Sequence, residues 1–163
     1  MEGNAITVSG PKGEVRRVFQ GGSIKLSVTP TSVHLTSAKN RKREKKTAGT
    51  ITAHVKNMIK GASEGHRYVL KICSGHFPMN VTATQTTFTI KNFLGEKVPR
   101  TLTIKPGAKV TVDGQNVVVE STSKDVAGQV AADIEQLTRI TNRDPRVFQD
   151  GIYITNKDGK EIK

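Results

Sequence analysis

The side chains that could do chemistry in this chain are few and widely spaced. Cys73 and His76 form a single Cys-x-x-His pair, whereas a structural zinc site needs about four such ligands. Asp133 and Glu135 are two residues apart on an expected helix, where their side chains cannot share a face. These patterns predict neither a metal site nor a pair of catalytic carboxylates, so we expect no enzymatic activity and no cofactor.

The densest chemical feature is a run of Lys and Arg at 38–46, AKNRKREKK. Cationic side chains at this density neutralise phosphates and release the counterions that are condensed on a nucleic acid. The same pattern is typical of a solvated loop or of a nuclear-import signal, and the three interpretations are compatible. We favour RNA contact, and the candidate residues are Lys39, Arg41, Lys42, Arg43, Lys45 and Lys46.

A second group of cations lies in the stretch NRDPRVFQDGIYITNKDG, residues 142–159. Asp144 precedes a proline, which is typical of a helix start because the acid can cap the first turn and proline fits the first helical position. The stretch therefore predicts one or two helical turns followed by a short strand, with Phe148 plugged into the core. Arg143 and Arg146 are three residues apart and are expected to share one face.

The composition limits the classes of protein to which the chain can belong. Its 26 Lys and Arg against 14 Asp and Glu give a net charge of +12 and a pI near 10.0, which indicates a polyanionic partner, most often nucleic acid. One cysteine excludes an intramolecular disulfide and favours a reducing compartment. No apolar run approaches the ~20 residues that a membrane helix needs. We therefore expect a cytoplasmic protein with no membrane partner and no small-molecule substrate.

Three blocks of sequence recur in the same order in the two halves of the chain, with their apolar positions aligned. One such match could arise by chance, but three in order indicate a duplicated module. The aligned pairs are 6–14 with 88–96, 25–37 with 109–121, and 48–58 with 127–137.

Each copy of the module predicts alternating strands followed by one amphipathic helix. The helix of the first copy is expected at 50–60, with Thr50 as its cap, and that of the second copy at 123–138. An antiparallel sheet that carries one helix on one face buries such apolar stripes. The predicted fold class is therefore α+β: a tandem duplication of a small module, each an antiparallel β-sheet with one α-helix packed on one face.

The predicted domains are a first module at 1–62, a second module at 63–154 and a C-terminal tail at 155–163. The second module opens with two strands, in RYVLKI and NVTAT, for which the first module has no counterpart. The first module is therefore predicted to be shortened at its N-terminus. It is also the more cationic, since Lys and Arg exceed Asp and Glu by nine in residues 1–62 and by three in the rest.

The C-terminal stretch also resembles the signature of a known family. The segments ITVSGPKGEVRRVF, HVKNMIKGASEGHRYVLKICSGHFPMNV and IKNFLGEK are similar to other parts of that family. It is the universal large-subunit ribosomal protein six family, in its archaeal and eukaryotic branch, and the resemblance covers nearly the whole chain. The matching signature positions are Gln136, Ile140, Arg143, Arg146, Phe148, Asp150-Gly151, Ile152-Tyr153 and Lys157.

The resemblance implies a structural constituent of the large ribosomal subunit that supports translation and has no enzymatic activity. It implies binding to rRNA near the stalk base and the sarcin–ricin region, chiefly through the second module, and contact with neighbouring large-subunit ribosomal proteins. By motif position it makes Arg143, Arg146 and Lys157 the expected RNA-facing residues, and Phe148 and Tyr153 structural. The implied location is the cytoplasmic ribosome, and nucleolar passage during assembly is compatible with it. The alternative is a free nucleic-acid-binding adaptor whose basic run acts as a nuclear-import signal.

Overall fold

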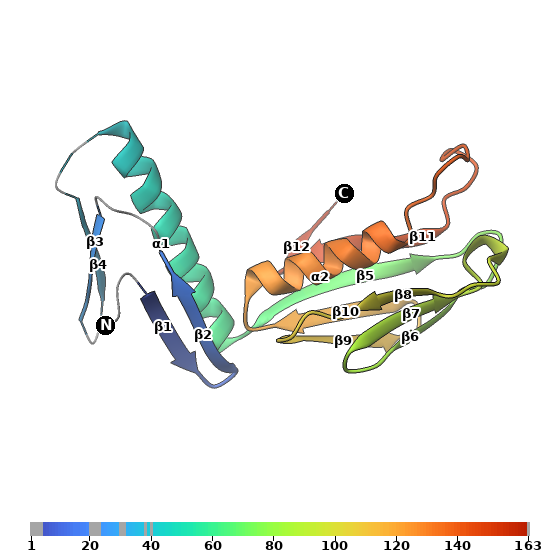
Figure 1. The fold of residues 1–163 in the computed structure, drawn as a ribbon, viewed down its shortest axis with the longest axis horizontal. Helices are drawn as coiled ribbons and strands as arrows, with labels where there is room; N and C mark the ends of the chain where they lie inside the picture. Colours follow the sequence, from blue (N-terminus) through green and yellow to red (C-terminus); the bar gives the residue numbers. More distant parts are fainter. Residues whose placement is uncertain (1–4, 20–23, 30–31, 38, 40, 163) are drawn as a thin grey trace. The chain divides into compact units, whose positions relative to one another are not determined.

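The computed structural model describes residues 5–19, 24–29, 32–37, 39 and 41–162. It divides into two compact units, Met1–Glu64 and Gly65–Lys163 (Figure 1). Each unit contains antiparallel strands followed by one long helix, in the same order along the chain. The predicted α+β class with an internal duplication is confirmed. The predicted shortening of the first module concerns residues 1–4, which lie outside the described residues.

The strands of the first unit form two hairpins. One consists of β1 (Ala5–Gly10) and β2 (Gly13–Val18), and the other of β3 (Ile24–Val28) and β4 (Val33–Ser37). Within the described residues, the two hairpins are separate two-stranded sheets and share no backbone ladder. The helix α1 (Lys42–Ser63) packs against β1 and β2 and buries the apolar side chains of both hairpins.

The core of the first unit is small. Its helical part is a stripe at intervals of three and four residues, which places these side chains on one face of α1. The side chains buried in this core are 4–7% exposed, and they are Ile6, Phe19, Ile24, Ile51, Val55 and Met58.

The helix α1 begins eight residues before Thr50, so the predicted boundary at Thr50 is wrong. Thr50 is an interior residue whose hydroxyl donates to the carbonyl of Lys46 at 3.0 Å. Lys, Arg, Glu and Ala are strong helix formers, and the buried face extends back from Ile51 through Ala48 to Glu44. The sequence did not predict this extension because Glu44, a charged residue, occupies a position of the apolar stripe.

The second unit contains a five-stranded sheet in the order β12-β11-β5-β10-β9. Residues 155–163, predicted to be a tail, include the end of β11 and all of β12, because their backbone groups continue the sheet. The bounds are β5 (His66–Cys73), β9 (Ala108–Asp113), β10 (Asn116–Ser121), β11 (Gly151–Lys157) and β12 (Lys160–Glu161).

A second sheet in this unit consists of β6 (Asn80–Ala83), β7 (Thr87–Lys91) and β8 (Arg100–Thr103), with the short 3₁₀ helix η1 (Phe93–Gly95) between β7 and β8. The helix α2 (Lys124–Leu137) lies along the larger sheet and packs on β5, β10 and β11 (Figure 1). The side chains between α2 and the two sheets form one continuous core. Its fully buried members include Leu70, Phe88, Ile90, Val117, Val119, Ile134 and Ile152.

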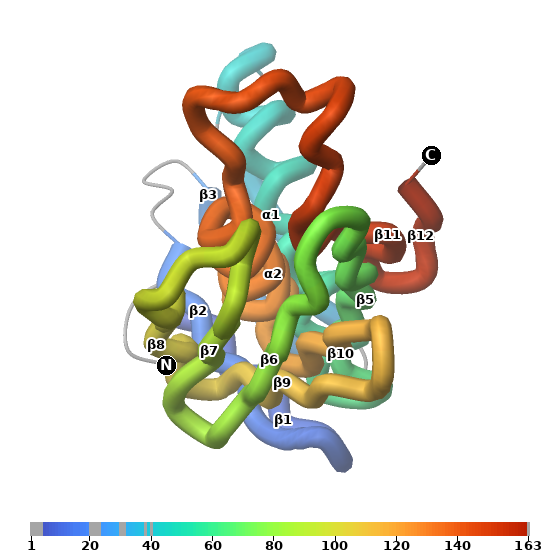
Figure 2. Tube along the Cα trace, turned by 90° about the vertical axis from the view of Figure 1, so that its right-hand side faces the viewer, coloured from blue at the N-terminus to red at the C-terminus, as the bar shows by residue number. Residues whose placement is uncertain are grey.

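One long connection leaves this compact arrangement. Residues 138–150 extend from the end of α2 and return to the start of β11 (Figure 2). Hydrogen bonds fix this connection to residues 75 and 76, which lie in the turn after β5. The predicted arginines of the C-terminal stretch are carried on this connection.

Candidate nucleic-acid interface

The cationic run predicted to be a loop is largely the first turns of α1. Lys39 and Arg41 precede the helix, and Lys42 opens it. Ala38 and Asn40 lie outside the described residues. All six predicted cations have exposed side chains, and they are Lys39, Arg41, Lys42, Arg43, Lys45 and Lys46.

This helix end has the polarity of an anion-binding surface. The N-terminus of a helix carries a partial positive charge and unsatisfied backbone N–H groups, and Arg41 at the N-cap makes no side-chain hydrogen bond to them. Cations next to such an end are each unfavourable by a few tenths of a kcal/mol. The only acid of the first turn, Glu44, is 9% exposed and faces the core. An anion bound here would gain attraction from both the helix and the side chains.

Arg146 lies on a single turn that follows Asp144, Arg143 precedes that turn, and the predicted helix does not form. Asp144 caps this turn: its Oδ1 accepts from the backbone N–H of Arg146 at 2.9 Å, and its carbonyl accepts from the N–H of Phe148 at 2.9 Å. The same carboxylate forms an ion pair with the guanidinium of Arg146 at 3.2 Å, and the arginine side chain is 89% exposed. Exposed ion pairs of this kind contribute little to stability because water screens them, so the arginine can exchange its partner for a phosphate.

A buried carboxylate fixes this connection to the second unit. Asp150 is 1% exposed and accepts from the backbone N–H groups of Gly75 (2.5 Å) and His76 (3.0 Å) and from Nδ1 of His76 (2.6 Å). Burial raises the pKa of the Asp150 carboxyl, but the hydrogen bonds from His76 and Gly75 and the charge of His76 outweigh it, so this pKa lies below its ordinary value. The pair joins residues that are 74 positions apart, and the sequence analysis did not find it.

Phe148 does not enter the main core, so the prediction of a hydrophobic plug is wrong. Its ring is half-buried and stacks on the imidazole of His76, with ring centroids 4.8 Å apart and planes inclined by 26°. The guanidinium carbon of Arg143 lies over the same ring, 4.7 Å from its centroid. The three side chains form a cation–aromatic stack that holds Arg143 at the surface. The stack is possible because the hydrogen bonds of Asp150 bring the two loops together.

Lys157 is exposed but lies apart from the two arginines. It ends β11, whereas the arginines precede the start of that strand at Gly151. A strand rises about 3.3 Å per residue, so Lys157 and the arginine-bearing connection lie at opposite ends of β11. The structure therefore groups Arg143 with Arg146 and separates both from Lys157.

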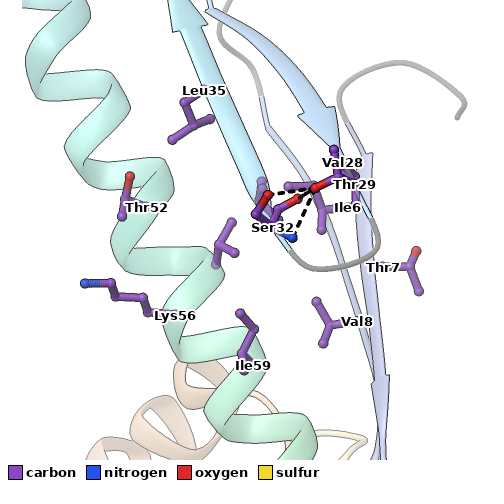
Figure 3. A pocket seen from close by; sticks show the side chains of 12 residues that line it. Ile6, Thr7, Val8, Val28, Thr29, Ser32, Leu35, Thr52, Lys56 and Ile59 are labelled. Carbon is purple, nitrogen blue, oxygen red and sulfur yellow. Dashed lines mark hydrogen bonds between the residues drawn. The ribbon is translucent and has the colours of Figure 1, made fainter.

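Two of the hollows lined by described residues bear on the function. The first, of about 410 Å³, lies in the first unit between β1, the β3–β4 hairpin and α1. Figure 3 shows Ile6, Val8, Leu35 and Ile59 on its apolar sides, with Lys56 nearby. The second, of about 630 Å³, lies in the second unit between residues 73–76 and residues 147–153.

The described residues offer no group of three or more His, Cys, Asp or Glu that could hold a metal ion. Within the same part of the chain, no helix has the length and apolar character needed to cross a membrane. Cys73 is partly exposed at the end of β5, and Nδ1 of His76 faces Asp150.

The fold and the charged surfaces together fit the class of basic, duplicated α+β proteins that bind polyanions. A family model described as ribosomal protein L6 matches residues 1–65 and 77–151, which are the two repeated parts of the chain. The chain therefore belongs to the ribosomal protein L6 family, which is a family of ribosomal proteins and not of enzymes. The family predicted from the sequence motifs is confirmed.

Curated relatives agree with this assignment. The chain is 43% identical to the large ribosomal subunit protein uL6 of Methanobrevibacter smithii, over 95% of this chain and 87% of that protein. It is 45% identical to the protein of the same name from Methanocella arvoryzae, over 96% and 89%. It is also 45% identical to the one from Methanosarcina mazei, over 94% and 88%.

Proposed function

We propose that this protein is a structural constituent of the large ribosomal subunit that binds rRNA and supports translation. The relatives are named as large-subunit proteins, and the chain has the strong positive charge that an RNA partner requires. The partners are large-subunit rRNA and neighbouring ribosomal proteins, and the protein is located on the ribosome. The proposed region of contact is the stalk base and the sarcin–ricin region, as the family resemblance implies.

The observation that carries the proposal is the cationic end of α1. Lysines and arginines crowd the end of a helix that already attracts anions, and they face solvent. This arrangement lowers the stability of the isolated protein slightly, and a bound phosphate backbone would reverse that cost. We propose Lys39, Arg41, Lys42, Arg43, Lys45 and Lys46 as the RNA contacts of the first unit.

The second unit would contribute a separate set of contacts. Arg143 and Arg146 lie on the connection before β11, and Lys157 lies at the far end of that strand. Two contact points separated along one strand would fix the orientation of the unit on structured RNA. Phosphate contacts of this type set register and orientation and do not specify bases.

Co-sedimentation tests the proposal. The tagged protein should sediment with the large subunit and remain there through a moderate salt wash, and it should be released when the rRNA is digested. A free nucleic-acid-binding adaptor would leave the subunit in the salt wash, because it would depend on few, exchangeable phosphate contacts. Recovery of the protein only in RNA-free fractions would contradict both functions. Passage through a nucleolus is tested separately, by imaging in a host that has one.

A further inference from the structure

The hollow between the 73–76 turn and residues 147–153 has the dimensions and chemistry of a ligand site. Its volume is about 630 Å³, within the range of small-molecule pockets. The exposed side chains of Val147 (59%) and Tyr153 (42%) form part of its wall. His76 also lines the hollow, and its side chain is 38% exposed. None of the nine cations predicted from the sequence lines it.

The imidazole of His76 is held in one orientation. The ionised carboxylate of Asp150 can only accept hydrogen bonds, so Nδ1 of His76 carries the proton that bridges them at 2.6 Å. Asp150 is itself fixed by two backbone N–H groups. The other ring nitrogen, Nε2, is on the far side of the ring from the carboxylate and has no hydrogen-bond partner among the described residues. The buried carboxylate of Asp150 therefore fixes the orientation of a partly exposed imidazole. Among the described residues, Nε2 makes no contact that stabilises the fold.

The groups around the imidazole favour an RNA ligand. The carboxylate that borders the hollow already accepts three hydrogen bonds, and the other groups with polar chemistry there are Cys73, Ser74, Gln149 and the phenol of Tyr153. Burial raises the pKa of that phenol, and Cys73, Asp150 and Glu135 raise it further, so the hydroxyl stays neutral. Arg143 is held against Phe148, which stacks on His76. Aromatic faces, neutral hydrogen-bonding groups and an adjacent guanidinium are what an unstacked nucleotide requires.

We propose that this hollow binds one unpaired nucleotide of large-subunit rRNA, with Nε2 of His76 contacting its sugar or base and Arg143 contacting an adjacent phosphate. The inference rests on the proposed function and adds to it a site at which single-stranded RNA is recognised. His76 would then have two roles: Nδ1 anchors the connection through Asp150, and Nε2 contacts the ligand.

The substitution His76→Asn keeps the anchor to Asp150 and removes the ring, so it tests Nε2 together with the stack on Phe148. Asparagine keeps a side-chain donor close to the position of Nδ1 and the backbone N–H that Asp150 accepts, but it removes Nε2. Binding of the full-length protein to deproteinised large-subunit rRNA should weaken by up to about tenfold, as expected for the loss of one hydrogen bond. His34→Asn is the matched control, because His34 is an exposed strand histidine of the first unit. The control should bind the same rRNA with unchanged affinity.

The substitution Val147→Glu tests the hollow independently of the anchor. Val147 is 59% exposed, so the variant should fold, and a carboxylate at the wall should repel the RNA backbone and weaken binding about tenfold or more. Val98→Glu is its control, since Val98 is 77% exposed and lies elsewhere in the second unit. A photo-crosslinker placed at position 147 should map to a single unpaired position of the rRNA.

The outcomes separate the inference from the proposed function. If His76→Asn and Val147→Glu bind rRNA as tightly as the unaltered protein does, the hollow does not bind RNA, and the proposed function stands. The same holds if the crosslink from position 147 reaches a neighbouring protein in the assembled subunit. If the unaltered protein binds large-subunit rRNA no better than it binds heparin, both the inference and the proposed function are overturned.

Discussion

The two units are copies of one module, but their sheets differ in completeness. In the second unit, β7 lies between β6 and β8, and β10 lies between β9 and β5. Their counterparts by repeat alignment, β1 and β4, each pair with one strand among the described residues. The first hollow, of about 410 Å³, lies against β1 in the first unit (Figure 3). The counterpart of β1 in the second unit is β7, which pairs there with β6.

The two cores differ in the same direction. Among the described residues, the core cluster of the second unit contains fourteen buried side chains, many of them fully buried. The core cluster of the first unit contains six, each 4–7% exposed. Hydrophobic stabilisation scales with the apolar area removed from water. The second unit is therefore expected to be the more stable of the two. The first unit carries most of the excess positive charge on a less stable core.

The largest loss of stability should come from shortening a buried side chain on the helix of each unit. Ile134→Ala removes a fully buried side chain and should cost about 4 kcal/mol, because the closed core around it cannot collapse into the cavity. Ile51→Ala, in the smaller core, should cost about 2 kcal/mol. Native-state hydrogen exchange measures both losses. Each should be confined to amides of its own unit, and equal losses in both variants would contradict the contrast between the cores.

Removing the charge of the helix end should affect binding and leave the fold intact. Replacing its four helical cations with alanine should lower rRNA affinity on the order of a hundredfold and reduce the slope of log affinity against log salt by about 3 to 4. The melting temperature should stay the same or rise slightly, because these cations oppose the helix dipole. Filter binding at several salt concentrations measures the slope. The four residues are Lys42, Arg43, Lys45 and Lys46, and a matched exposed set in the second unit is Lys71, Lys91, Lys97 and Lys109.

If the control set lowers the slope as much as the helix set does, the binding depends on total charge alone. The proposed role of the end of α1 would then be wrong. The test is therefore the difference in salt slope between the two sets of substitutions. The absolute affinity of either variant does not test the role of the end of α1.

Two glycine substitutions should change stability in opposite directions. A Cβ at Gly10 would overlap the backbone carbonyl of Ala62, so Gly10→Ala must shift backbone and should cost about 1–3 kcal/mol. A Cβ at Gly49 on α1 would meet nothing within 4 Å, so Gly49→Ala should stabilise the first unit by about 1 kcal/mol. Urea denaturation measures both changes, and destabilisation by Gly49→Ala would show that the face of α1 at this position is covered.

The smallest effect should be an acid-dependent loosening of the second unit. The pKa of Asp150 is lower in the folded protein than in the unfolded chain, so the carboxylate stabilises the fold fully above its unfolded pKa of about 3.9. That contribution is lost as the pH falls through the lower, folded pKa. The difference in melting temperature between the unaltered protein and Asp150→Asn should therefore shrink between neutral pH and strongly acidic pH. A difference that stays constant would mean that Asp150 is not ionised in the fold.

The sequence by itself determined the duplication, the α+β class, most strands of both units and the family, but it missed β12. These follow from local periodicity and from motifs, since apolar residues two apart predict strands and those three or four apart predict helices. It placed α1 eight residues too late, because Glu44 occupies a position of the buried stripe. It also predicted helical turns after Asp144, where a capped single turn was sufficient to satisfy the backbone.

Only the tertiary structure decided how the C-terminal connection is held and what it presents. Asp150 meets His76 across 74 residues of chain, and no periodicity or spacing encodes a contact at that distance. The position of Phe148 against His76 and of Arg143 against Phe148 depends on that one buried carboxylate. Local sequence determines which helices and strands form, because propensity and alternation act between near neighbours. The surface that these elements present depends on contacts between residues far apart in the chain, which form only when the elements pack together.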